Sequence, residues 1–226
     1  INFGTLKMTD ALGNEGTITG NLTHNFFRDF SFNFNASSPK LLLLNTTKLE
    51  NPIFYGKAIG KVNFFFRGPE KEMKMYVNAE VVDSSEMSIV TSSSSKSRGE
   101  AEYIVWRQYG REMNLDSLVK ASSNLLIDLD LRANPLLKMN VILDELTGDI
   151  ITATGSGNIK IHTGTSDELT LDGRYDIAKG NYNFNFQDIF KKPFVLEEGS
   201  GSFISWTGNP YDAEINIRAT YMAERV

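Results

Sequence analysis

Residues 173–187 read Gly173-Arg-Tyr-Asp-Ile-Ala-Lys-Gly-Asn-Tyr-Asn-Phe-Asn-Phe-Gln187, and this stretch decides the fold class. In its second half apolar and polar side chains alternate strictly, which places Tyr182, Phe184 and Phe186 on one face and amide side chains on the other. A period of two residues is typical of a β-strand with one apolar and one solvated face. The same alternation returns over residues 213–221, where one face carries Ala213, Ile215, Ile217, Ala219 and Tyr221.

Strand patterns recur along most of the chain, over residues 30–34, 62–66, 73–81, 127–131, 139–143, 159–161 and 169–171. Turn-forming residues separate them, as in Arg67-Gly-Pro-Glu70 and Leu146-Thr-Gly-Asp149. Short strands joined by Gly, Asn and Pro turns indicate an antiparallel meander. We therefore predict an all-β protein built on one long, curled antiparallel sheet.

One region departs from the strand pattern. Residues 92–99 form a polar, serine-rich run, and the residues that follow suit a short helix or an irregular connector near 100–122. We divide the chain into a first β segment (1–91), this polar insertion (92–124) and a C-terminal β segment (125–226). Both β segments have the same kind of pattern, so we expect one continuous sheet.

Composition excludes several classes of protein. The 226 residues include 23 basic and 28 acidic residues, and the net charge of −5 comes without a basic stripe, which argues against nucleic acid as a partner. Cysteine is absent, so no disulfide or thiol chemistry is available. The sequence contains no run of about 18 apolar residues, so it predicts no membrane-spanning helix. The chain begins at Ile1 without a start methionine or signal peptide, and we expect it to be a piece of a longer protein.

The sequence does not assemble a catalytic or metal site. His24 and His162 are the only histidines and lie far apart in the sequence, whereas a nitrogen-type metal site would need both and a carboxylate. Asp128 and Asp130 share the polar face of one strand, which is typical of a solvated surface. Gly155-Ser-Gly157 lacks the lysine and the helix of a phosphate-binding loop and indicates a bulge or tight bend. We predict no enzyme activity, no cofactor and no metal.

The apolar faces are rich in aromatic residues, with 15 Phe, 8 Tyr and 2 Trp. They could pack against one another as the core of a sandwich, or they could line a groove for acyl chains. A chain of about 16 carbons gains roughly 12 kcal/mol when it leaves water, at about 0.8 kcal/mol per methylene. Alternation tells which residues share a face but not what that face touches, so both interpretations stay open at this point.

Several motifs resemble the C-terminal domain of the TamB family, with the asparagine-rich character of its Bacteroidetes branch. They are Gly173-Arg-Tyr175, Gly180-Asn-Tyr-Asn-Phe184, Lys192-Pro-Phe194, Glu198-Gly199 and Ile204-Ser-Trp-Thr-Gly-Asn-Pro210, with weaker matches at Phe54–Val62 and Gly148–Ile159. The resemblance covers most of residues 48–91 and 125–221. Residues 1–47 and 92–124 carry no matching motif.

The resemblance implies a β-taco, which is a sheet folded lengthwise around an apolar groove, in a periplasmic protein anchored in the inner membrane. It implies transport of lipid to the outer membrane, assembly of nascent outer-membrane proteins with a BamA-like barrel partner of the TamA/TamL type, or both. The expected partners are therefore phospholipid acyl chains, that barrel and its clients. The residues that we expect to line the groove are Ile127, Leu129, Leu131, Met139, Val141, Leu143, Tyr182, Phe184, Phe186, Ile215 and Ile217.

Three further expectations concern the ends of the sheet and the alternatives. Gly180, Gly199 and Gly208 are expected in turns, and Trp206 at a groove edge or at the end of the sheet. Residues 213–221 contain no proline, so an unpaired edge there would be able to template another strand. The alternatives are a secreted or surface β-sandwich with a dry interior and a closed, lipocalin-like barrel with one bounded cavity.

Overall fold

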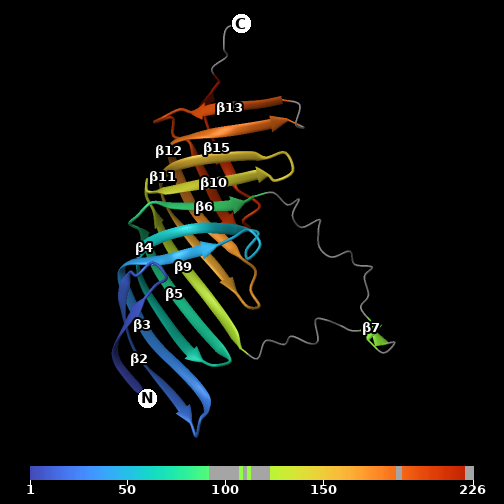
Figure 1. The fold of residues 1–226 in the computed structure, drawn as a ribbon. Helices are drawn as coiled ribbons and strands as arrows, with labels where there is room; N and C mark the ends of the chain where they lie inside the picture. The colour runs from blue at the N-terminus through green and yellow to red at the C-terminus, as the bar shows by residue number, and fades with distance from the viewer. Residues whose placement is uncertain (92–106, 109–110, 113–122, 187–189, 222–226) are drawn as a thin grey trace.

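The computed structural model describes residues 1–91, 107–108, 111–112, 123–186 and 190–221 (Figure 1). All regular elements in these residues are strands: β1 Asn2–Thr9, β2 Glu15–Asn25, β3 Arg28–Thr46, β4 Phe54–Pro69, β5 Glu72–Val81, β6 Ser85–Val90, β7 Arg107–Gln108, β8 Arg111–Glu112, β9 Asn124–Ala133, β10 Leu137–Asp144, β11 Asp149–Gly164, β12 Thr170–Phe186, β13 Phe190–Leu196, β14 Phe203–Gly208, β15 Glu214–Asn216 and β16 Ala219–Thr220. Fourteen form one sheet, and β7 pairs only with β8. The all-β prediction is confirmed, whereas most of the expected helix near 100–122 lies outside the described residues.

The long strands change partners halfway along their length. Residues 54–57 of β4 pair with β6, and residues 60–67 pair with β5. Residues 150–154 of β11 pair with β10, and residues 157–164 pair with β9. Strand β12 is divided in the same way between β13 and β14. Each long strand therefore crosses a fold line, which we call the crease, and contributes one half to each of two walls.

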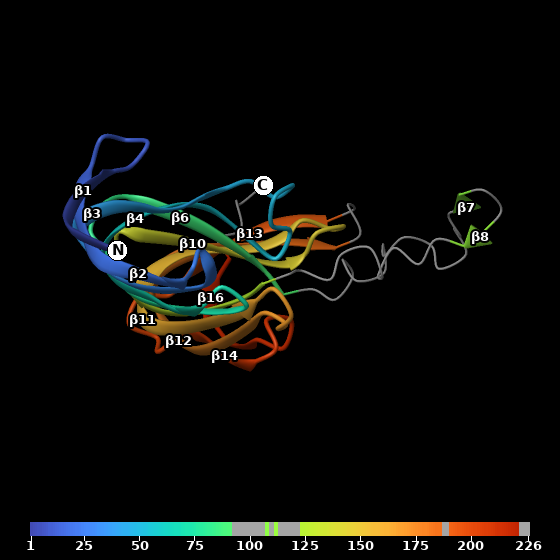
Figure 2. The same ribbon diagram turned by 90° about the horizontal axis from the view of Figure 1, so that it is seen from below.

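Wall A consists of β1, β2, β5, β9, β14 and β15, and wall B of β6, β10, β13 and β16, with halves of β3, β4, β11 and β12 in each. Figure 2 shows the walls as two layers, with β6, β10 and β13 in the upper layer and β11, β12 and β14 labelled in the lower one. We call the edge of each wall that lies away from the crease its rim. This lengthwise folding is the β-taco arrangement that was expected.

Glycines at the crease let neighbouring strands bend together. A Cβ atom built on Gly155 would lie 2.0 Å from the carbonyl oxygen of Asp176, and one on Gly157 would lie 2.0 Å from that of Arg174. The pairing of β11 with β12 also shifts register between Thr154 and Gly155. The bend that was predicted at Gly155–Gly157 is thus present, and only glycine allows so close a backbone approach.

The prediction of a purely antiparallel meander is wrong at two pairings, because β5 pairs with β9 and β6 pairs with β10 in parallel. The chain passes from wall A to wall B between β5 and β6, and it passes from wall A to wall B a second time between β9 and β10. Two successive crossings in one direction require a long return connection, and residues 91–123 provide it. The sequence insertion therefore has a topological role.

Six strands form a closed hydrogen-bonded ring in the order β4, β5, β9, β11, β10 and β6. The ring closes because β4 and β11 each belong to both walls. It is not a lipocalin-like barrel, because the sheet continues beyond the ring through β3, β2 and β1 on one side and through β12 on the other.

The hydrophobic core fills the space between the walls near the crease. Its largest fully buried side chains are Trp206, Tyr175, Ile89, Leu137, Met139, Ile151, Ile159, Leu171, Leu196, Ile204, Val62 and Val81. The Tyr175 hydroxyl donates a hydrogen bond of 3.1 Å to the carbonyl oxygen of Leu137 and so links β12 to β10. Burial raises the pKa of this hydroxyl well above its ordinary value, which keeps it neutral.

The β1–β2 turn is fastened to β3 by one carboxylate. Asp10 accepts hydrogen bonds from the side chain of Asn14 at 2.8 Å and from the backbone N–H groups of Leu42, Leu12 and Asn14 at 2.7–2.9 Å. These bonds, that from the Asn14 side chain first, lower the pKa of Asp10 from 3.8 to about 2. The turn is therefore held against the part of β3 that enters wall B.

Candidate functional site

An apolar surface extends along the inner face of wall A, on the half of the wall that is closer to its rim. Phe34 pairs with Phe66, Phe66 with Met75, and Met75 with Ile127, so four neighbouring strands place apolar side chains in one row. We call this surface the trough, and its members are Phe3, Leu6, Leu22, Phe32, Phe34, Phe64, Phe66, Met75, Val77, Ile127 and Leu129.

Alternation identifies this face as the inner one. Val62 on β4, Ala79 on β5 and Leu131 on β9 point into the buried core. 

On β5 the residue of this buried row is Ala79, which pairs with Val62 on one side and with Leu131 on the other. Residues two positions further along the same strand face the same side, so Phe64 on β4 and Val77 on β5 also face inward.

Burial decreases from the crease to the rim. Ala79 and Leu131, close to the crease, are at most 5% exposed, whereas the trough residues of β3, β4, β5 and β9 are only half-buried. At the β1 end, Phe3 and Leu6 are 38% and 44% exposed. The rings remain in contact, with centroid distances of 5.6 Å between Phe3 and Phe34. The trough is therefore continuous but incompletely covered.

Wall B is shorter than wall A at this end of the molecule. Its first described strand is the last part of β3, residues 41–46, which pairs only with β4. Strands β1 and β2 belong to wall A alone, since within the described residues β1 pairs only with β2, and β2 only with β1 and with the wall A half of β3. The trough crosses β1, β2, β3, β4, β5 and β9, which corresponds to about 24 Å at a strand spacing of about 4.8 Å.

The interior is closed further along the sheet. Met139 and Ile151 of wall B pack with Tyr175 and Trp206 of wall A in one cluster, and each of the four is at most 1% exposed. No space for a ligand chain remains among such fully buried side chains. The trough therefore ends against a packed section, which we call the closed section.

A second aromatic group lies at the far end of wall B. The Tyr182 and Phe194 rings are stacked at 6.1 Å, and Phe184 lies 6.0 Å from Tyr182. The Phe194 ring contacts Tyr221 at 5.7 Å, and the Lys192 ammonium lies 4.1 Å from the centre of the Tyr221 ring. Burial raises the pKa of Tyr182, and the nearby Asp149 carboxylate adds to the effect.

A comparison with protein families matches the model of the TamB C-terminal domain to residues 4–225. The chain belongs to the TamB family. The match includes residues 4–47 and 92–124, which carried none of the motifs that we recognised in the sequence. Comparisons with curated proteins and with solved structures give no match.

TamB proteins belong to the translocation and assembly module, a non-enzymatic family for transport and assembly. They are anchored in the inner membrane, span the periplasm and work with TamA-like partners. Within the described part of this chain, no helix is long and apolar enough to cross a membrane.

In this TamB domain, the residues predicted to line the groove occupy four different environments. Ile127 and Leu129 lie in the trough. Leu131, Met139 and Val141 are buried in the core, and the residues packed against its margin are Leu143, Tyr182, Ile215 and Ile217. Phe184 belongs to the aromatic group of wall B, and the side chain of Phe186 lies outside the described part.

Most trough residues were missed from the sequence. The alternation of Phe30–Phe34 and Met73–Val81 was visible and pointed to strands, but nothing marked these faces as less covered than the others. Gly180, expected in a turn, lies inside β12 against the backbone of β11, and Trp206, expected at an edge, is 1% exposed in the core.

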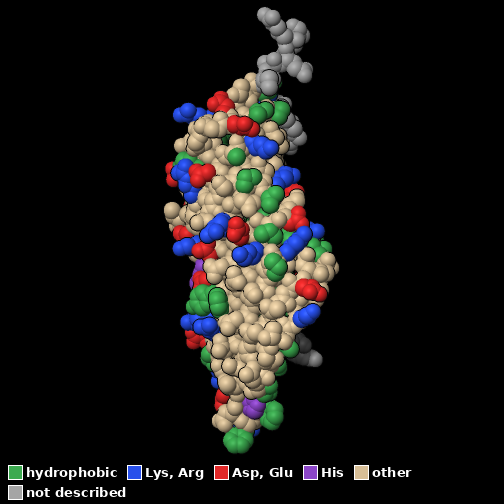
Figure 3. All heavy atoms as spheres, turned by 90° about the vertical axis from the view of Figure 1, so that its left-hand side faces the viewer, with side chains coloured by type: hydrophobic (Ala, Val, Ile, Leu, Met, Phe, Trp, Pro, Cys, Tyr) green, Lys and Arg blue, Asp and Glu red, His purple; other side chains and the backbone are tan. Residues whose placement is uncertain are grey.

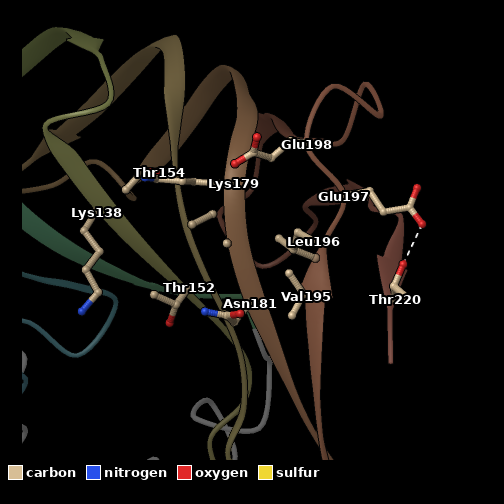
Figure 4. A pocket seen from close by; sticks show the side chains of 12 residues that line it. Lys138, Thr152, Thr154, Lys179, Asn181, Val195, Leu196, Glu197, Glu198 and Thr220 are labelled. Atoms are coloured by element: carbon tan, nitrogen blue, oxygen red, sulfur yellow. Dashed lines mark hydrogen bonds between the residues drawn. The ribbon is translucent and has the colours of Figure 1, made fainter. Parts of the chain in front are cut away.

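The outer faces of both walls carry charged side chains, such as Lys138 and Lys179 on wall B and Asp128 and Asp130 on wall A. A cavity of about 650 Å³ opens on the outer face of wall B, and Figure 4 shows Lys138, Thr152, Lys179 and Asn181 around it. It is separate from the trough, because it lies on wall B and opens on the outer face, whereas the trough lies on the inner face of wall A. On the outer face of wall A, His162 Nδ1 lies 2.6 Å from a carboxylate oxygen of Asp128.

The two histidines are not brought together, since His24 lies near the β2–β3 turn and His162 on β11. Among the described residues, no group of three or more His, Asp or Glu side chains is arranged to hold a metal ion. Asp128 and Asp130 are half-buried on the outer face of β9.

Proposed function

We propose that this domain shields lipid acyl chains on their way between the inner and outer membranes, and that the trough is where the chains lie. The observation that carries the proposal is the row of half-buried apolar side chains across six strands, enclosed on neither its rim side nor its β1 end. The groove-lining role of Ile127 and Leu129 is part of the proposal. The periplasmic location follows from the family and is proposed for this chain.

The energetics favour a surface of this kind. An acyl chain of about 16 carbons loses roughly 12 kcal/mol of unfavourable hydration when it is fully buried, at about 0.8 kcal/mol per methylene. A trough that is open on one side would recover part of this value. Partial burial suits a carrier, because a chain that is held too tightly would not move on.

The trough and the closed section would have different roles in lipid transport. Acyl chains would occupy the part from β1 to β9 and would enter over the rim. At the closed section they would have to leave the groove, or the walls would have to separate there. The other groove-lining residues that we predicted, Met139 and Val141 among them, would contact lipid only in that opened state.

A matched pair of variants on β4 tests the proposal. Phe66 points into the trough, whereas the adjacent Phe65 is also half-buried but lies on the outer face, 5.4 Å from the Arg67 guanidinium. We expect phospholipid to co-purify with the wild-type chain in native mass spectrometry, to be lost from Phe66→Glu and to be retained by Phe65→Glu. Lipid-free wild type, or equal lipid in both variants, would count against the trough.

A second role, assistance in the assembly of outer-membrane β-barrels, is favoured by the exposed sheet edge of β3. Residues 41–46 pair with β4 on one side only. Of their backbone groups, the N–H of Leu42 donates a hydrogen bond to the Asp10 carboxylate. An unpaired edge can accept an extended strand through its backbone, largely regardless of sequence.

This role predicts cross-linking at the β3 edge. The chain has no cysteine, so Asn45→Cys on β3 provides a unique thiol at the edge, and Lys61→Cys on the doubly paired β4 provides the control. A cysteine-bearing barrel client should form a disulfide with position 45 and not with position 61. Cross-linking at neither position would remove the support for strand templating.

A further inference from the structure

The β2–β3 turn exposes the two most accessible phenylalanines of the described chain. Phe26 is 91% exposed and Phe27 is 77% exposed. In Figure 1 this turn is the lowest point of the molecule, and Figure 3 shows hydrophobic side chains and a histidine at the lower end of the surface. Apolar side chains of this size are usually covered in a soluble domain.

The backbone of the turn makes the two phenylalanines more unusual. Asn25 pairs with Arg28, so Phe26 and Phe27 are the central residues of a two-residue hairpin, and their φ angles are +46° and +60°. This conformation favours glycine and asparagine and is strained for bulky side chains. Two aromatic residues thus occupy positions where turn geometry alone favours small ones.

The tip is held in a fixed arrangement. The His24 ring stacks on the Phe27 ring with centroids 4.6 Å apart and planes at 16°, and its centroid lies 5.8 Å from that of Phe30 in an edge-to-face arrangement. The backbone N–H of Phe27 donates a 3.2 Å hydrogen bond to Nδ1 of His24. The protein itself therefore satisfies this N–H group, which would otherwise be costly to remove from water.

We propose that this tip, defined by Phe26 and Phe27, inserts into the interfacial region of a lipid bilayer. The two side chains would bury about 300–500 Å² together, well below the roughly 800 Å² per partner of a stable protein interface. A bilayer needs no complementary pocket and accepts aromatic rings at the level of its headgroups. Arg28 follows Phe27 directly in the sequence and would meet lipid phosphates at that depth.

The tip is also continuous with the trough, because Leu22 pairs with Phe32 only a few residues away on the same two strands. The proposal nevertheless stands apart from acyl transport. Insertion of the tip requires only a bilayer surface, and its test uses no lipid bound in the trough.

A fluorophore on a single cysteine tests the insertion directly. The chain with Phe26→Cys is labelled with an environment-sensitive nitrobenzoxadiazole group and mixed with phosphatidylethanolamine/phosphatidylglycerol vesicles. The control is Leu49→Cys, at a residue that is 98% exposed in the β3–β4 turn of wall B. We expect a blue shift and increased emission at position 26 and no change at position 49. No change at position 26, or the same change at both, would overturn the proposal.

A second variant separates insertion from folding. Phe26→Asn with Phe27→Gly introduces the residue pair that this turn type prefers, so the melting temperature should rise. Vesicle binding in co-sedimentation should fall about tenfold or more, because both apolar anchors are lost. Unchanged vesicle binding by this stable double variant would contradict the proposal, as would a protein partner that requires both rings while vesicles do not bind.

Discussion

Substitutions at two methionines allow the packing of the closed section and of the trough to be compared. Met139 is 0% exposed in the closed section, and Met75 is half-buried in the trough. Replacing a buried methionine by alanine costs about 2–5 kcal/mol, because it removes buried methylenes and leaves a cavity. Met139→Ala should therefore cost about 3 kcal/mol, which corresponds to a fall in melting temperature of roughly 6–12 °C for a chain of this size.

Met75→Ala should cost much less. Its side chain already meets solvent, and its removal leaves a wider trough rather than an enclosed cavity, so we expect about 1 kcal/mol and roughly 2–4 °C. Differential scanning calorimetry of both variants and the wild type provides the comparison. Equal losses for the two variants would refute the distinction between an open trough and a closed section and would favour a uniformly packed sandwich.

Two further predictions concern polar groups that fasten the fold. Hydrogen bonds from the Asn14 side chain and from three backbone N–H groups lower the pKa of Asp10 from 3.8 to about 2. The stabilising effect of the Asp10 carboxylate is therefore present above pH 4 and is lost as the pH falls through 2. Asp10→Asn should lower the melting temperature at pH 7, and a difference that persists unchanged at pH 2 would argue against this linkage. Tyr175→Phe should cost about 1–3 kcal/mol in urea unfolding, because it leaves the buried carbonyl of Leu137 without its hydrogen bond; a variant as stable as the wild type would show that this bond contributes nothing.

The sequence predicted the strands well because alternation is a local property. Each alternating run noted along residues 30–34, 73–81 and 139–143 lies within one strand, and Gly155–Gly157 marks a bend. The crease itself was not predicted, although β12 carries a sign of it: its apolar positions change from odd numbers (Tyr175, Ile177) to even numbers (Tyr182, Phe184) across the register shift between β11 and β12.

Whether the opposite wall covers an apolar face depends on long-range contacts. For this reason only some of the residues predicted to line the groove lie in the trough. Met139 and Phe66 both lie on apolar faces of alternating strands, yet one is buried under the opposite wall and the other is not. The difference depends on how far wall B extends along wall A. The parallel pairing of β5 with β9 was missed for a similar reason, since it depends on the direction in which the chain returns after residue 123.

The most direct measurement of the central claim is to map where acyl chains touch the protein. Benzoylphenylalanine, a photoreactive analogue, would replace Phe66 in the trough, Phe65 on the outer face, or Met139 in the closed section, and irradiated cells would be examined for lipid adducts by mass spectrometry. The account predicts adducts at position 66, few at 139 and none at 65. Adducts at 65 as frequent as those at 66, or none at 66 in a folded protein, would contradict it.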